Sequence, residues 1–250
     1  DTLLGVLPLF HSFGTMSMWF ALRTGIGLVF HPNPLDSVAI GGLVEKFGAT
    51  MLIATPTFLQ IYMRRCTPGQ LGSLRIVLTG AERLPDKVAN AFEEKFGIRP
   101  IEGYGATECA PAITVSTLDF RGRGIYQFGS RRGFVGHPVP GLSIRVVDQD
   151  SGEPLPHGKP GMLLVRGPNV MKGYIGREDL TAKAIRDGWA PERTELEVLR
   201  ASRPQAQAVH TPSAPQTTTQ LLQCAVELSC PLAGAEKRFE PPVLDTAAKR

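Results

Sequence analysis

Short apolar runs alternate with longer segments whose apolar residues recur at helical spacing along the N-terminal part of the chain. The strand-like runs are residues 3–8, 28–30, 50–54, 74–78 and 98–101. The helix-like segments extend from the loop at His11 to about Thr24, over 35–47, from Pro56 onward, and from Pro85 to 96, and Gly48 and Gly97 follow as C-terminal stops. This alternation with short connections predicts an α/β fold, a mostly parallel sheet layered with helices.

The pattern changes near Gly136. Two β-rich runs, 142–147 and 162–165, are separated by turns rich in Gly, Pro and Asp, which predicts a small antiparallel β subdomain. Beyond Trp189 the chain carries clusters of Pro, Ala, Gln and Thr, a composition typical of a disordered tail. We therefore expect an α/β subdomain over 1–135, a β-rich subdomain over 136–189, and a disordered tail over 190–250.

Polar and glycine-rich segments directly follow three of the predicted strands. They are the loop that holds His11, the turn at Thr79-Gly80, and the hexapeptide Gly103-Tyr104-Gly105-Ala106-Thr107-Glu108. Because the carboxyl ends of parallel strands lie at one edge of a sheet, we expect these three segments to converge there.

The hexapeptide contains several groups that suit a nucleotide. Its two glycines allow close backbone approach to a ligand, and Tyr104 offers an aromatic face for a base. Thr107 offers a hydroxyl to a phosphate oxygen, and Glu108 offers carboxylate oxygens of the kind that Mg²⁺ prefers. The residues alone leave open a second interpretation, a tight turn with a packed tyrosine.

Composition narrows the class of protein. With 250 residues and 42% hydrophobic residues, the chain can bury one good core. The most apolar window, 16–30, is interrupted by Arg23 and is too short to span a bilayer. Four cysteines show neither zinc-ligand nor disulfide-framework spacing, which suits a reducing cytosol.

The formal net charge of +4 has one local concentration, four arginines set among glycines and aromatic residues. They are Arg121, Arg123, Arg131 and Arg132. This cluster predicts either an anionic partner, such as phosphates or an acidic carrier protein, or an ordinary solvated loop. No nucleic-acid-binding module accompanies it, so we expect no nucleic acid partner.

The hexapeptide GYGATE resembles the signature of the adenylate-forming (AMP-binding) enzymes, which include acyl-CoA synthetases, luciferases and peptide-synthetase adenylation domains. Three further segments match that family in order, LPLFHSFG at 7–14, TGAERL at 79–84 and GMLLVRGPNVMKGY at 161–174. Their wording is most similar to bacterial acyl-acyl-carrier-protein synthetases, which are often fused to a 2-acylglycerophosphoethanolamine acyltransferase. The resemblance covers residues 1–189, the latter half of the family's large domain.

The resemblance implies ATP-dependent activation of a carboxylic acid, here a fatty acid, to an acyl-adenylate, followed by transfer to the thiol of CoA or of an acyl-carrier protein. It implies a catalytic set of His11, Thr107 and Glu108, with Glu108 as the Mg²⁺ ligand. It also implies that the nucleotide is bound by Gly80, Ala81, Glu82, Gly103, Tyr104, Gly105, Ala106 and Thr107.

Departures from the family pattern leave two alternatives open. The chain begins at Asp1 rather than Met and lacks the family's phosphate loop, and after Trp189 the expected Thr-Gly-Asp is replaced by Ala190-Pro191-Glu192-Arg193. The family's C-terminal domain with its catalytic lysine is also absent. The alternatives are an inactive truncated fragment with at most partial nucleotide binding, and an amino-acid adenylation domain. We expect a cytosolic location, with membrane association only through a fused domain outside this chain.

Overall fold

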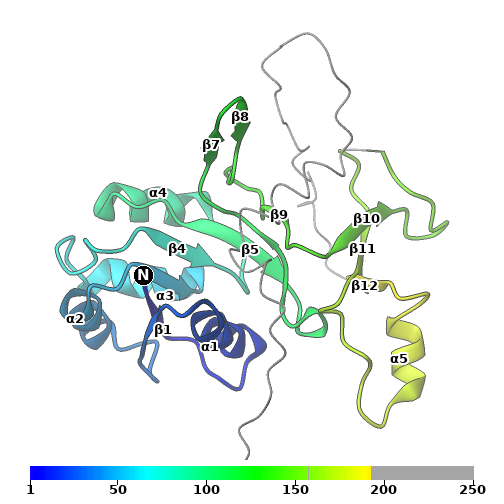
Figure 1. The fold of residues 1–250 in the computed structure, drawn as a ribbon, viewed down its shortest axis with the longest axis horizontal. Coiled ribbons are helices and arrows are strands. Elements are labelled where there is room, and N and C mark those ends of the chain that lie inside the picture. Colours follow the sequence, from blue (N-terminus) through cyan, green and yellow to red (C-terminus); the bar gives the residue numbers. More distant parts are fainter. Residues whose placement is uncertain (157, 193–250) are drawn as a thin grey trace, which may run out of the picture. The chain divides into compact units, whose positions relative to one another are not determined.

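A computed structural model describes residues 1–156 and 158–192, and Figure 1 shows its elements. A seven-stranded sheet has the order β2-β1-β3-β4-β5-β6-β9. Its strands are β1 (Thr2–Gly5), β2 (Gly27–Phe30), β3 (Met51–Ala54), β4 (Ile76–Thr79), β5 (Ile101–Gly105), β6 (Ala112–Val115) and β9 (His137–Pro138). The first five run parallel, whereas β6 and β9 are antiparallel to their neighbours.

Four helices connect the parallel strands. They are α1 (Ser12–Thr24), α2 (Ser37–Phe47), α3 (Pro56–Arg65) and α4 (Asp86–Phe96). Three of them begin at a residue whose side chain accepts a backbone hydrogen bond from the first turn, namely His11, Asp36 and Thr55. Gly48 and Gly97 end α2 and α4, as the sequence predicted, and both adopt the left-handed conformation.

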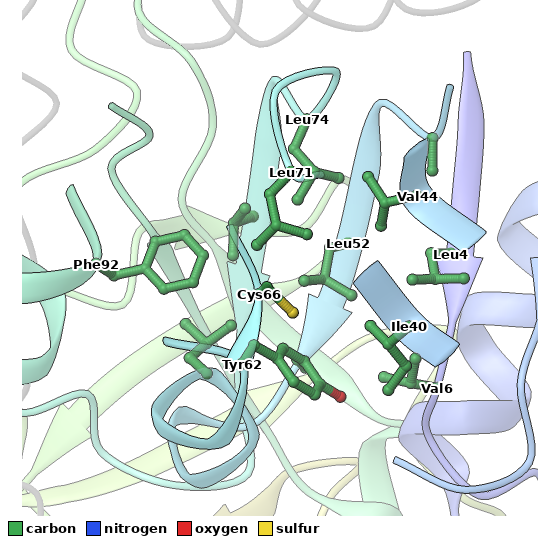
Figure 2. Close-up of a cluster of buried hydrophobic side chains, with 14 residues drawn as sticks. Leu4, Val6, Ile40, Val44, Leu52, Tyr62, Cys66, Leu71, Leu74 and Phe92 are labelled. Carbon is green, nitrogen blue, oxygen red and sulfur yellow. The ribbon is translucent and has the colours of Figure 1, made fainter. Parts of the chain in front are cut away.

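The helices cover the sheet on both faces. In β1, Leu4 packs into the cluster formed with α2, α3 and α4, whereas the neighbouring Leu3 packs into a cluster with Ala21 of α1. The first cluster is the main core, and Figure 2 shows Leu52 of β3, Tyr62 and Phe92 among its side chains. Burial raises the pKa of the Tyr62 hydroxyl, which donates to the Pro34 carbonyl oxygen at 2.9 Å.

Two smaller sheets follow in the chain. One is a hairpin of β7 (Phe120–Gly122) and β8 (Ile125–Gln127), and the other is the antiparallel sheet β10 (Ser143–Val147), β11 (Met162–Arg166) and β12 (Ala190–Glu192). Helix α5 (Glu178–Ala184) lies between β11 and β12 in the chain. Trp189 stands just before β12, and the guanidinium carbons of Arg145 and Arg166 lie 4.3 and 6.0 Å from its ring centroid.

The predicted fold class is confirmed for the described residues. The strand expected at 98–101 is instead Ile101–Gly105, because the two glycines of the hexapeptide pair with β6 through a register shift at Tyr104 and Gly105. The tail was expected from residue 190, yet Ala190–Glu192 form β12 on β11. The remaining residues of that expected tail, 193–250, lie outside the described residues. The boundary between 1–135 and 136–189 stays a prediction.

Candidate functional site

The candidate site lies where the strand order reverses. Strand β2 lies on one side of β1 and β3 on the other, so connections leaving the carboxyl ends of β1 and β3 diverge there. In doubly wound sheets such a point forms a crevice for ligands. The loop of His11 follows β1, Thr55 follows β3, the Gly80 turn follows β4, and the hexapeptide ends β5. The sequence predicted that the His11 loop, the Gly80 turn and the hexapeptide converge at one sheet edge, and Thr55 follows a fourth strand of the same sheet.

The second half of the hexapeptide forms a tight loop. Residues Thr107–Cys109 make one turn of 3₁₀ helix, and the Ala106 amide donates to the Pro111 carbonyl oxygen at 2.8 Å. A Cβ added at Gly105 would lie 1.9 Å from that same oxygen, so this position requires glycine. Thr107 is exposed and Glu108 is half-buried, which leaves both side chains at the surface of the loop.

Three residues from the segment after β11 hold this loop. The Asn169 side-chain amide donates to the carbonyl oxygens of Cys109 at 2.6 Å and of Ala112 at 2.8 Å. The Met171 amide donates to the Glu108 carbonyl oxygen at 2.7 Å. The Tyr174 hydroxyl donates to Glu108 Oε1 at 2.8 Å, so both the backbone and the carboxylate of Glu108 are positioned by the same segment.

The turn after β4 lies directly beside the hexapeptide. Strand β4 pairs Thr79 with Glu102, and a Cβ at Gly80 would lie 3.5 Å from the Gly103 carbonyl oxygen and 3.0 Å from the Phe13 ring. Ala81 adopts φ +66°, a left-handed conformation that is uncommon for alanine. Such local strain is concentrated at ligand sites in proteins.

Glu82 and His11 each have an identified hydrogen-bond partner. The Thr57 hydroxyl, at the start of α3, donates to Glu82 Oε2 at 2.6 Å. His11 is exposed and caps α1, its Nδ1 accepting from the Phe13 amide at 3.2 Å. The next residue, Ser12, places its hydroxyl oxygen 3.5 Å from that of Thr107. The histidine loop and the hexapeptide therefore meet through Ser12 and Thr107.

Tyr104 lies on β5 opposite Thr114 and is half-buried. It packs against a cluster that includes Cys109 and Leu163. Both interpretations of this tyrosine therefore have physical support, because packing against the cluster leaves the residue half exposed.

A half-buried carboxyl, that of Glu102, lies one residue before the hexapeptide. Burial raises the pKa of Glu102, and the hydrogen bond that it accepts from the Leu84 amide at 3.4 Å opposes that shift. Glu102 thus stands between the β4 turn and the start of α4, which suits a role in positioning rather than in reaction.

The structure adds residues that the sequence did not single out as parts of the site. Ser12, Asn169 and Tyr174 contact predicted site residues or the loop that carries them. Tyr174 and Asn169 belong to a segment already matched to the family, and this is the one signal by which they could have been found. Their partners lie 66 and 60 residues away in the chain.

Comparison with known proteins identifies a family. The model of the AMP-binding enzyme family matches residues 1–175. A feruloyl-CoA synthase from Amycolatopsis sp is 35% identical over 184 residues, which cover 73% of this chain and 36% of the relative. A long-chain-fatty-acid–CoA ligase from Bacillus subtilis (strain 168) is 29% identical over 198 residues, covering 76% and 33%.

Solved structures agree with this assignment. ATP-bound MatB from Rhodopseudomonas palustris superposes with a TM-score of 0.66 at 30% identity, covering 76% of this chain and 36% of that structure. O-succinylbenzoate coenzyme A synthetase from Bacillus subtilis in complex with AMP gives a TM-score of 0.62 at 26% identity, covering 76% and 37%. The chain spans about a third of the length of the curated relatives that it matches. On its sequence and fold, this chain belongs to the AMP-binding enzyme family.

Proposed function

We propose that the protein containing this chain is an ATP-dependent acid–thiol ligase. A carboxylate oxygen attacks the α-phosphorus of ATP, the bond to the bridging oxygen breaks and pyrophosphate leaves. A thiolate sulfur then attacks the acyl carbonyl carbon, and AMP leaves. The single observation that carries the proposal is the meeting of three chain segments at one sheet edge, joined by Ser12 to Thr107 at 3.5 Å and by Gly80 beside Gly103.

The chain's own residues would bind and orient the reactants. Gly80, Ala81 and Glu82 would line the base, Tyr104 would stack on it, and Thr107 would donate to the α-phosphate. A carboxylate is already a nucleophile, so catalysis needs positioning and neutralisation of phosphate charge rather than a general base. His11 caps the start of α1, next to Ser12, whose hydroxyl contacts that of Thr107. His11 would therefore lie near the reacting carboxylate.

The residues fit Mg²⁺ in one particular mode. Among the described residues no group of three or more His, Cys, Asp or Glu side chains could hold a metal ion. Mg²⁺ is often held by one or two carboxylates together with water and substrate phosphates. Glu108, fixed by Tyr174 at 2.8 Å, supplies such a carboxylate. When bound, the ion would neutralise phosphate charge during the transfer.

The substrate class is a carboxylic acid, and we propose a fatty acid with CoA or an acyl-carrier protein as acceptor. Named relatives are a feruloyl-CoA synthase and long-chain-fatty-acid–CoA ligases, which supports acid–thiol ligation across different acids. The choice of a fatty acid rests on the motifs FHSFG (10–14) and GPNVMKGY (167–174), which resemble those of acyl-acyl-carrier-protein synthetases. We further propose that the protein acts in the cytosol.

Pyrophosphate exchange into ATP tests the proposal in the full-length protein that contains this chain. A long-chain fatty acid should drive exchange, whereas an aromatic acid and an amino acid should drive it weakly. Glu108→Gln should abolish most of the exchange, and Glu94→Gln, on the exposed side of α4, should leave it unchanged. Exchange driven only by an amino acid would instead indicate an adenylation domain, and no exchange with any acid would refute the ligase assignment.

A further inference from the structure

The hairpin of β7 and β8 stands apart from the rest of the fold. Its strands pair only with each other, and a backbone hydrogen bond from Thr117 to Gly129 at 2.8 Å closes its base. Among the described residues, no core cluster includes any residue between 117 and 128. A two-stranded ribbon without a hydrophobic core contributes little stability. Packing within the domain therefore does not explain why this hairpin carries large apolar and basic side chains.

Large apolar side chains of this hairpin face water. Leu118, Phe120, Ile125 and Phe128 are 59%, 43%, 44% and 48% exposed. The strand register places Phe120 and Ile125 on one face, because Phe120 pairs with Gln127 and Gly122 pairs with Ile125. The Phe120 ring also lies against Gly122, where an added Cβ would meet it at 3.1 Å. Such a concentration of exposed apolar groups marks an interaction surface.

The other face and the tip of the hairpin are basic. Arg121 pairs with Tyr126 and places its guanidinium carbon 4.5 Å from that ring centroid. Arg123 is exposed in the turn between the strands. Neither arginine takes part in an ion pair within the part of the chain that the structure describes. The hydrogen bond from the Gly129 amide and, to a smaller extent, the attraction of Arg121 lower the pKa of the Asp119 carboxyl. This attraction is not an ion pair and leaves both guanidinium groups able to contact an anionic partner.

The nearest acidic residue is committed to the hairpin itself. Asp119 is the one acid between residues 117 and 134 of the sequence. Its carboxylate accepts from the Tyr126 hydroxyl and from the Gly129 amide, each at 2.9 Å. These hydrogen bonds order the base of the hairpin, and the surface at its tip stays basic.

We infer that this hairpin, residues 117–128, docks on an anionic lipid surface. The apolar side chains would enter the boundary between headgroups and acyl chains, while the arginine stems extend and place their charges at lipid phosphates. An acidic protein would satisfy the arginines but would need a matching apolar groove for Phe120 and Ile125, whereas a bilayer accepts both groups without such a match.

This binding mode is peripheral. None of the helices among residues 1–156 and 158–192 is long and apolar enough to cross a membrane. The sequence predicted membrane association only through a fused domain, and the hairpin places a candidate surface within the chain itself. The inference does not depend on the ligase assignment, although a fatty acid substrate would itself partition into the same bilayer.

Vesicle co-sedimentation of the 250-residue chain tests the inference. The chain should bind vesicles of phosphatidylcholine mixed with phosphatidylglycerol, and should bind pure phosphatidylcholine far less. The double substitution Arg121→Gln/Arg123→Gln should lower partitioning on the order of thirtyfold at low salt. A charge-matched control, Arg64→Gln/Arg65→Gln at the exposed end of α3, should stay within about threefold of the parent chain.

The apolar contribution is tested separately. Phe120→Ser/Ile125→Ser should reduce binding even at high salt, where the arginine effect is screened. All variants should keep the parent's circular dichroism and urea midpoint, because the hairpin lies outside the core clusters. Equal vesicle binding by parent and hairpin variants, an equal loss in the α3 control, or binding to polyglutamate without vesicle binding would each overturn the inference. Pyrophosphate exchange is measured independently, so failure of one proposal leaves the other testable.

Discussion

Asn169 offers a direct test of how the hexapeptide loop is held. Its side-chain nitrogen donates to the carbonyl oxygens of Cys109 and Ala112, while its Oδ1 is buried and has no hydrogen-bond partner. Replacing this residue therefore changes two hydrogen bonds and one unsatisfied acceptor at the same time. Asn169→Ala removes all three features, whereas Asn169→Asp keeps the shape and replaces the donor by an oxygen.

The two substitutions differ in expected magnitude. The Ala variant loses two hydrogen bonds of about 1 kcal/mol each and regains about 1 kcal/mol because the unsatisfied acceptor is gone, a net loss of about 1 kcal/mol. In the Asp variant a carboxylate oxygen replaces the donor that lies 2.6 and 2.8 Å from the two carbonyl oxygens. The repulsion between these oxygens should lower the free energy of unfolding by about 3 kcal/mol or more. With a urea m-value of about 2 kcal/mol per molar, the unfolding midpoint should fall by about 0.5 M in the Ala variant and by at least about 1.5 M in the Asp variant.

Urea unfolding followed by circular dichroism measures these shifts, and hydrogen exchange of residues 106–112 measures the loop itself. The facing carbonyl oxygens would raise the pKa of the introduced carboxyl in the folded state, so the Asp penalty should be largest above that pKa and should fade as the pH falls through it. Equal midpoints for the Ala and Asp variants at neutral pH, or unchanged exchange in 106–112, would refute this account of the loop.

Four further substitutions probe the site and the core. Glu108→Gln should lower pyrophosphate exchange by about 100-fold at limiting Mg²⁺ with an unchanged circular dichroism spectrum, and an unchanged rate would remove Glu108 from metal binding. Tyr104→Ala should weaken ATP binding by about 1–3 kcal/mol in calorimetric titration, and an unaltered dissociation constant would argue against stacking. Tyr62→Phe should cost about 1 kcal/mol in urea because its hydrogen bond to Pro34 is lost, and an unshifted midpoint would contradict that reasoning. Burial raises the folded-state pKa of Glu102, so its ionisation opposes folding at neutral pH; Glu102→Gln should stabilise the chain there, and this gain should shrink as the pH falls through that pKa. A pH-independent gain would exclude ionisation as its cause.

The parallel half of the fold could be predicted because its signals are local. A capping side chain begins α2 at Asp36 and α3 at Thr55, and glycines end α2 and α4, all within a few residues of the elements that they bound. The site's general position followed from the same pattern, since loops after successive parallel strands reach one sheet edge.

Features that depend on distant partners could not be predicted in this way. Gly103 and Gly105 have low strand propensity, yet both lie in β5 because β6 pairs with them. The sequence of the hairpin at 120–127 contains Gly122 and Gly124 and has no period-two run of apolar residues, so it predicts a loop rather than two strands. The hydrogen bond from Tyr174 to Glu108 joins the segment after β11 to the segment after β5, and only the folded chain brings these two segments together.

The two tryptophans have contrasting surroundings, so their intrinsic fluorescence can report on two different parts of the protein. Trp19 on α1 is 61% exposed, so its emission should lie at long wavelength and respond readily to acrylamide. Trp189 is half-buried beside Arg145, in the region of the three-stranded sheet β10-β11-β12. In a Trp19→Phe chain the remaining emission would report on that sheet alone, and in a Trp189→Phe chain it would report on the helix beside β1 and β2. The order in which the two sheets lose structure can therefore be followed by intrinsic fluorescence, without any attached dye.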